Sequence, residues 1–254
     1  MRRFWEFITS PLLCVACGIG FFLSGLFLSL FLDGAPGYFE DIESSLLLTW
    51  LRGKVAAGFS LPLIFFLLFL LVVAVFTLNL VLCTGDHLTG LVRRRSGLRR
   101  FIPHIMHVAV VLVVAGHAVS ASSGARVKGV GVLEGRGVRL FAPAWTLYLE
   151  DVDIEVGKWG YPADMVAHVK IQAEGVTVAR GSTRPNEPFF VDGYVLYLKN
   201  AGVLPSGARY ALFDLTRDPG APVVLIGALL FTLGNLLYLL FPARNFRKNE
   251  RRGK

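Results

Sequence analysis

The segment 103–122 is an almost unbroken apolar run that nevertheless carries three histidines, His104, His107 and His117. Its length matches that of an α-helix crossing the hydrocarbon core of a bilayer, which takes about 20 residues at about 1.5 Å each. An ionisable side chain inside such a span is costly, so its presence indicates a function, and a neutral imidazole is the commonest metal ligand. The run therefore predicts a membrane helix that is able to hold a metal.

The spacing of the three histidines places them at two levels of this helix. His104 and His107 are three residues apart and share one helix face near one end. His117 lies ten residues beyond His107, which is about 15 Å further along the axis. One ligand cluster therefore cannot use all three, and the helix is expected to present a ligand toward each side of the membrane.

Three further apolar runs, at 11–32, 60–83 and 222–242, have the length of membrane spans. With 54% apolar and 17% charged residues, the composition is far from that of an ordinary soluble domain. Basic residues gather after the second and the fourth span, where the positive-inside rule expects cytoplasmic segments. The sequence predicts four transmembrane helices in a lipid bilayer with both termini in the cytoplasm. The net charge of +8 then reflects topology, and nucleic acid is not an expected partner.

Two features beside the spans predict local contacts. Asn79, close to the end of the second span, is expected to hydrogen-bond to a neighbouring helix. In the loop 33–57, apolar residues from Phe39 to Trp50 recur at three- and four-residue steps. This pattern predicts a short amphipathic helix at the membrane interface, with Trp50 as its anchor.

The region 124–218 has the pattern of a β domain, with alternating apolar and polar residues between Gly, Pro and Asn turns. Strands are predicted at 146–156, 165–173, 176–180 and 194–199. They indicate a compact antiparallel domain, a sandwich or a partial barrel. The expected fold is thus an α-helical membrane protein with four transmembrane helices and an exoplasmic all-β domain between the third and the fourth. The predicted domains are 1–122, 123–220 and 221–254.

Side chains of the β region give no sign of an independent catalytic centre. His168 alternates onto the same face as Val166 and Lys170 and is expected at the surface rather than as a ligand. Asp151 and Asp153 are expected on a solvated face. The sequence contains no phosphate-binding loop, dinucleotide-binding glycine pattern, His-Glu-x-x-His motif, serine nucleophile elbow or Cys-x-x-Cys-His haem attachment site. A self-sufficient hydrolase or thiol oxidoreductase is therefore not expected.

Four short motifs, in this order along the chain, resemble those of a known family. They are Asn79 with Cys83-Thr84; His107 with Gly116, Gly124 and Glu134-Gly135; Asn186-Glu-Pro188 with Gly193 and Tyr197; and Asp218-Pro-Gly220 with Pro222. Together they resemble the ResB family of cytochrome c biogenesis proteins, from about Asn79 to the C-terminus.

The resemblance implies a subunit of a cytochrome c haem lyase complex that is non-catalytic alone. It implies a location in the bacterial inner membrane, with the β domain in the periplasm. The subunit would act with a CcsA-type protein, which carries a tryptophan-rich haem-handling motif, to bring haem to the outer face for attachment to apocytochrome c. His107 resembles the membrane histidine of the family, which implies an axial ligand of haem b. His117, with Arg126 as a partner for a haem propionate, and His104 are further candidate ligands because of their place in or beside an apolar span.

Two other functions stay open on the sequence. The chain is alternatively a b-type haem electron-transfer subunit, which exchanges electrons between quinol and an exoplasmic partner through haems on His107 and His117. A third hypothesis is a structural membrane anchor whose β domain docks a partner. The alternative role for His107 is an interhelical hydrogen bond.

Overall fold

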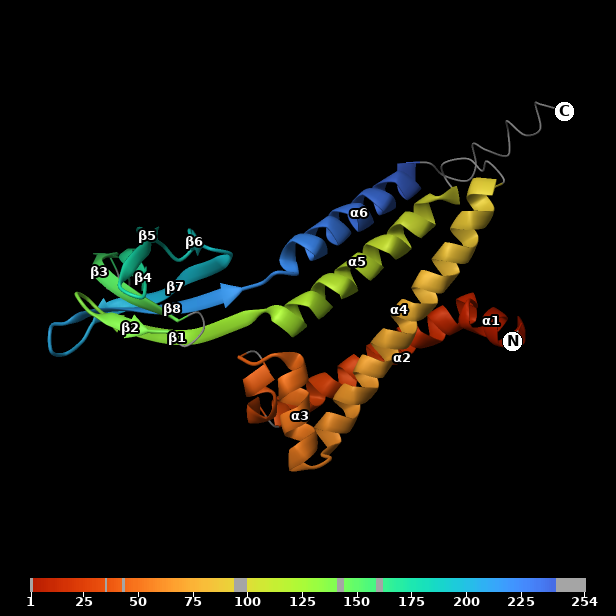
Figure 1. The fold of residues 1–254 in the computed structure, drawn as a ribbon, viewed down its shortest axis with the longest axis horizontal. Helices are drawn as coiled ribbons and strands as arrows, with labels where there is room; N and C mark the ends of the chain where they lie inside the picture. Colours follow the sequence, from red (N-terminus) through yellow and green to blue (C-terminus); the bar gives the residue numbers. More distant parts are fainter. Residues whose placement is uncertain are drawn as a thin grey trace. The chain divides into compact units, whose positions relative to one another are not determined.

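The computed structural model describes residues 2–34, 36–42, 44–93, 100–140, 144–158 and 162–240. The chain divides into two compact units, which are shown in Figure 1. The first takes in Met1–Glu40, Leu47–Ser122 and Gly220–Lys254, and the second takes in Asp41–Leu46 and Ser123–Pro219. The basic C-terminal tail and most of the basic loop between the second and third spans lie outside the described residues.

The helical unit contains four helices that are long and apolar enough to cross a membrane, as predicted. They are α2 (Pro11–Gly34), α4 (Leu61–Arg93), α5 (Ile102–Ser123) and α6 (Ala221–Leu240). By length and composition the chain is a multi-pass membrane protein. The short helices α1 (Arg2–Ile8) and α3 (Leu47–Ala57) come in addition, and α4 continues ten residues beyond the predicted end of its span.

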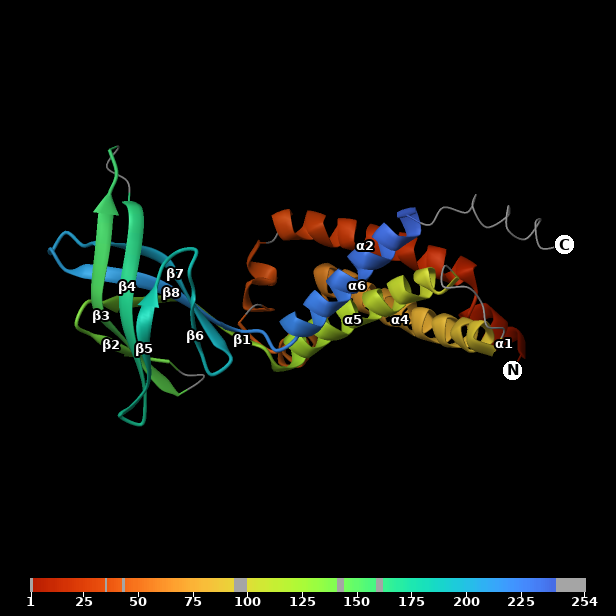
Figure 2. The same ribbon diagram turned by 90° about the horizontal axis from the view of Figure 1, so that it is seen from above.

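Glycines allow α5 and α6 to pack at close range, side by side in both views (Figures 1 and 2). Gly220, Gly227 and Gly234 recur at seven-residue steps and face α5. A Cβ atom at Gly227 would lie 2.8 Å from the carbonyl oxygen of Ala109, and one at Gly116 would lie 2.6 Å from the side chain of Val224. The two backbones therefore approach closely only because these side chains are absent, as in other membrane helix pairs.

Asn79 confirms the expectation of an interhelical hydrogen bond. It is 1% exposed, and its Nδ2 donates to the carbonyl oxygens of Ile8 and Ser10, the latter at 3.3 Å. These carbonyls lie where α1 ends and α2 begins, with Pro11 at the first position of α2. A break between helices exposes backbone groups that hydrocarbon cannot solvate, and the amide of Asn79 satisfies them.

The prediction that Trp50 anchors an interfacial helix is wrong in two respects. The helix begins at Leu47 rather than near Phe39. Trp50 is also only 5% exposed, because it stacks on Phe39 at 5.6 Å and meets Phe66 edge-on at 5.3 Å between ring centroids. The aromatic side chains turn toward one another, and other residues of α3 form its outer face.

The second unit is a sandwich of two four-stranded antiparallel sheets. One sheet has the order β1-β8-β7-β6 and the other β2-β3-β4-β5; β3, β4 and β5 run side by side in Figure 2. The strands are β1 (Ala125–Leu133), β2 (Gly137–Arg139), β3 (Trp145–Val156), β4 (Pro162–Ala173), β5 (Val176–Thr183), β6 (Phe189–Val191), β7 (Tyr194–Val203) and β8 (Arg209–Arg217). Inward side chains such as Leu149, Val169 and Phe213, each 0% exposed, form the common core.

Candidate functional site

Three imidazoles gather where α4 and α5 face each other near the basic loop. The ring of His104 stacks on that of His87, with centroids 5.7 Å apart and an interplanar angle of 29°. The ring of His107 meets His104 edge-on, with centroids 5.9 Å apart. His104 and His107 are neighbours on α5, as their spacing predicted, and His87 on α4 was not predicted to join them.

His107 is held by a hydrogen bond to a second helix. Its Nδ1 lies 3.3 Å from the hydroxyl oxygen of Thr84 on α4, and Thr84 is 5% exposed. The alternative role considered for His107, an interhelical hydrogen bond, is thus present. An imidazole has two nitrogens, however, and this contact leaves Nε2 for another partner.

His107 also lines an apolar pocket between α5 and α6. The pocket has a volume of about 250 Å³. Its other lining residues are Pro103, Met106 and Val110 of α5, with Phe231 and Tyr238 of α6. The site therefore offers one imidazole in a wall of hydrocarbon and aromatic groups, which is the setting in which an apolar, metal-containing ligand would bind.

The other two imidazoles have different surroundings. Nδ1 of His87 lies 2.9 Å from the carbonyl oxygen of Cys83, one turn earlier in its own helix, and the side chain is exposed. Within the described part of the chain, the buried Nδ1 of His104 has no hydrogen-bond partner. Among the residues that the structure describes, no group of three or more His, Cys, Asp or Glu side chains is placed to hold a metal ion.

The two remaining predicted site residues are not members of this cluster. His117 is exposed on α5, ten residues beyond His107, and the structure brings it into no contact with the other imidazoles among the described residues. Arg126 is an exposed residue of β1, in the second unit. The assignment of His107, His117, His104 and Arg126 to a haem site stays a prediction.

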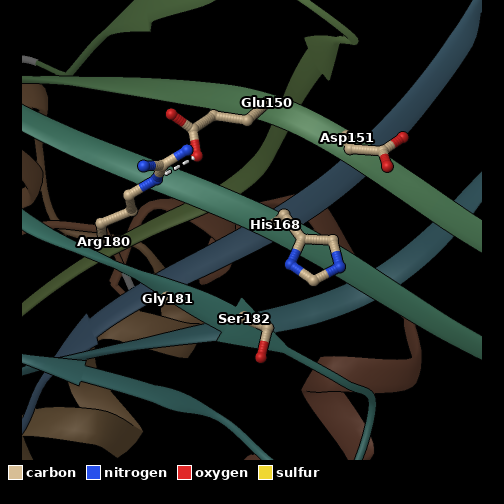
Figure 3. Close-up of a pocket in the computed structure, with 6 residues that line it drawn as sticks. All are labelled: Glu150, Asp151, His168, Arg180, Gly181 and Ser182. Atoms are coloured by element: carbon tan, nitrogen blue, oxygen red, sulfur yellow. Dashed lines mark hydrogen bonds and ion pairs between the residues drawn. The ribbon is translucent and has the colours of Figure 1, made fainter.

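A polar groove on the outer face of β3, β4 and β5 is the second candidate site (Figure 3). Its volume is about 690 Å³, and it is lined by Glu150, Asp151, His168, Arg180, Gly181 and Ser182. The strand has a β-bulge between Leu149 and Asp151. Because the extra residue breaks the alternation of the strand, the neighbouring carboxylates of Glu150 and Asp151 both face outward. Nε of Arg180 donates to Glu150 at 2.7 Å, so the charges lining the groove are partly paired.

Asp151 and His168 lie at the surface, as predicted. The side chain of His168 is 45% exposed, with Nε2 3.5 Å from Asp153. Asp151 accepts an ion-pair contact from Arg209 at 3.2 Å. The pKa of Asp151 is lower than its usual value. The causes are a side-chain hydrogen bond with Glu134, the backbone N–H of Val152 and the charge of Arg209.

No family model matches the chain, and neither does any curated protein sequence. Among solved structures, the chain is similar to one described as "Cytochrome c Heme Lyase CcmF", with 19% identity and a TM-score of 0.41. The match covers 66% of this chain and 30% of that one, so the chain spans less than a third of the length of that protein.

Proposed function

We propose that this chain is a haem-handling membrane subunit of a cytochrome c biogenesis complex of the System II type. It would help present haem at the outer face for attachment to apocytochrome c, with a CcsA-type protein as its partner. On this proposal it lies in the bacterial inner membrane, both termini are cytoplasmic, and the β unit is exoplasmic.

The observation that carries the proposal is the setting of His107. Its imidazole lies in a largely apolar helix, with Nδ1 at the hydroxyl of Thr84 and its side chain in the wall of the pocket between α5 and α6. The donor chemistry of His107 fits a haem, because a porphyrin supplies the equatorial ligands and requires only an axial side chain from the protein. The pocket of about 250 Å³ is smaller than the range of about 300 to 1,000 Å³ that is usual for such ligands, so the partner protein would complete the walls of the site. The order of the sequence motifs from Asn79 to Pro222 supports the same function.

Each residue has a defined task in the proposed site. His107 would bind the iron through Nε2, and the walls formed by Val110, Phe231 and Tyr238 would exclude water. When bound, the haem supplies an iron whose oxidation state can change. Arg100, exposed two residues before α5, would pair with a propionate. The candidates for a second ligand are His117, with Arg126 as a partner for a propionate, and His104.

The test is the visible spectrum of the protein purified in detergent, produced with and without a CcsA-type partner. Variants His107→Ala, His117→Ala and His104→Ala are compared with wild type, and His168→Ala on the sheet surface is the matched control. We expect a reduced-haem spectrum in wild type and in the control that is lost in His107→Ala. Absence of haem from every sample, even with the partner present, would refute the proposal.

A further inference from the structure

Thr84 uses its hydroxyl differently from three other hydroxyl residues of the apolar helices. Thr77, Thr232 and Ser24 return their hydroxyls to a carbonyl oxygen one turn earlier in the same helix, at 2.8, 2.9 and 2.7 Å. This is the ordinary way to satisfy such a group in hydrocarbon. The hydrogen bond of Thr84 runs to the Nδ1 of His107 on the neighbouring helix. The buried hydroxyl therefore acts on an imidazole.

The hydrogen bond also bears on the tautomer of His107. A neutral imidazole carries its proton on one nitrogen and a lone pair on the other. The hydroxyl of Thr84 has no other hydrogen-bond partner among the described residues, so its own proton is satisfied only by donating to Nδ1, which places the imidazole proton of the haem-free protein on Nε2. Metal-binding histidines are commonly oriented by such a contact to the nitrogen that does not bind the metal.

We infer that Thr84 is a positioning residue, whose hydroxyl donates to Nδ1 of His107 in the haem-free protein and would accept the Nδ1 proton once Nε2 binds an iron, so that the imidazole keeps one orientation beside the apolar pocket between α5 and α6. This inference rests on the proposed function for the identity of the ligand. The hydrogen bond and the tautomer belong to the haem-free protein as well, so they are measured independently.

Three variants of α4 separate this role from general packing. Thr84→Val keeps the shape of the side chain and removes the hydroxyl, whereas Thr84→Ser keeps the hydroxyl. Thr77→Val is the matched control, because the Thr77 hydroxyl bonds within its own helix to the carbonyl oxygen of Val73. Thermal unfolding of each variant shows that the comparison is made on folded protein.

The first readout is the tautomer of His107 in haem-free protein, from the imidazole nitrogen shifts of isotope-labelled histidine. We expect the Nε2–H form with a hydrogen-bonded Nδ1 in wild type, Thr84→Ser and Thr77→Val, and the nitrogen shift of an Nδ1 without a hydrogen bond in Thr84→Val. The second readout is haem affinity from a titration followed by the visible spectrum. Thr84→Val is expected to bind haem about 10- to 100-fold more weakly than wild type, and Thr84→Ser to restore most of the loss.

The outcomes separate this inference from the proposed function. An unchanged Nδ1 shift and haem affinity in Thr84→Val, or a failure of Thr84→Ser to restore them, would overturn the role of Thr84. Loss of haem in His107→Ala would still support the proposed function in that case. If His107→Ala binds haem as wild type does, the proposed function fails, and the Nδ1 shift still decides the role of Thr84.

Discussion

Asn79 is a single side chain that satisfies two carbonyl groups at the junction of α1 and α2. Asn79→Leu removes both hydrogen bonds inside an apolar environment. We expect it to lower the free energy of unfolding by about 0.6 to 2 kcal/mol, the range for polar contacts between membrane helices. Unfolding titrations in mixed micelles measure this change.

The control for Asn79 is Asn235→Leu on α6. Asn235 is exposed and bonds at 2.8 Å to the carbonyl oxygen of Phe231, one turn earlier in its own helix. Its replacement should therefore change the free energy of unfolding much less. Equal losses in the two variants would show that the contact of Asn79 with α1 and α2 is not what stabilises the fold.

Asp151 makes the stability of the β unit depend on pH. Its folded pKa is lowered, and the contacts that favour its ionised form are the backbone N–H of Val152 at 2.8 Å and the guanidinium of Arg209 at 3.2 Å. Their contribution is therefore present above the ordinary value of 3.8 and is lost as pH falls through the folded pKa. In Asp151→Asn, the stability of the β unit should change less with pH in this range. Thermal unfolding of wild type and variant, followed by circular dichroism from pH 7 down to about pH 3, measures it. Parallel profiles would contradict the prediction.

The histidines show how far residue-level prediction from sequence extends. His107 was identified because an imidazole in a hydrocarbon run is conspicuous. His117 has the same sequence signal, yet it is exposed and apart from the others. His87 was overlooked because it lies at the polar end of a span, and only the approach of the last turns of α4 to the first turns of α5 brings it to His104. His87 and His104 are 17 positions apart, so their contact is set by tertiary packing. The local sequence pattern around each residue does not reveal such a contact.

At the scale of elements, the pairing of α5 with α6 depends on missing side chains. In Gly227→Ala, the new Cβ would lie 2.8 Å from the carbonyl oxygen of Ala109, a backbone atom that cannot move aside cheaply. We expect the free energy of unfolding to fall by about 1 to 3 kcal/mol, as for other overpacked sites. Gly18→Ala on α2 is the control, because its Cβ would meet nothing within 4 Å. Equal stability of the two variants would argue against close packing here.

Strands and helices differ in how well the sequence predicted them. The apolar runs of the four long helices were visible because each one spans about 20 residues. The three-residue strands β2 and β6 are too short to show alternation. In β1 the register shifts between Val127 and Val130, which interrupts the pattern. β8 does alternate, with Ala211, Phe213 and Leu215 buried, and this signal was available but not used.

At the scale of the whole molecule, the placement of basic residues predicts which segments face the cytoplasm. In a chain whose native cysteines are replaced by alanine, Ser206→Cys lies in the exposed turn before β8, and Arg100→Cys lies just before α5. A membrane-impermeant maleimide added to intact cells should label Ser206→Cys, and should label Arg100→Cys only after the membrane is opened. Labelling of Arg100→Cys in intact cells would show that the topology is the reverse of the predicted one.

The β unit begins and ends at neighbouring points of the chain. Ala125, where β1 starts, is the register partner of Arg217, where β8 ends, and Gly116 of α5 contacts Val224 of α6. A helical hairpin of this kind accepts an inserted domain at little entropic cost, because the ends of the insert are already close together. Over evolution, such a domain can be enlarged, shortened or exchanged while the hairpin keeps its packing. In engineering, the same two joints are the natural place to graft a different domain onto the helical unit.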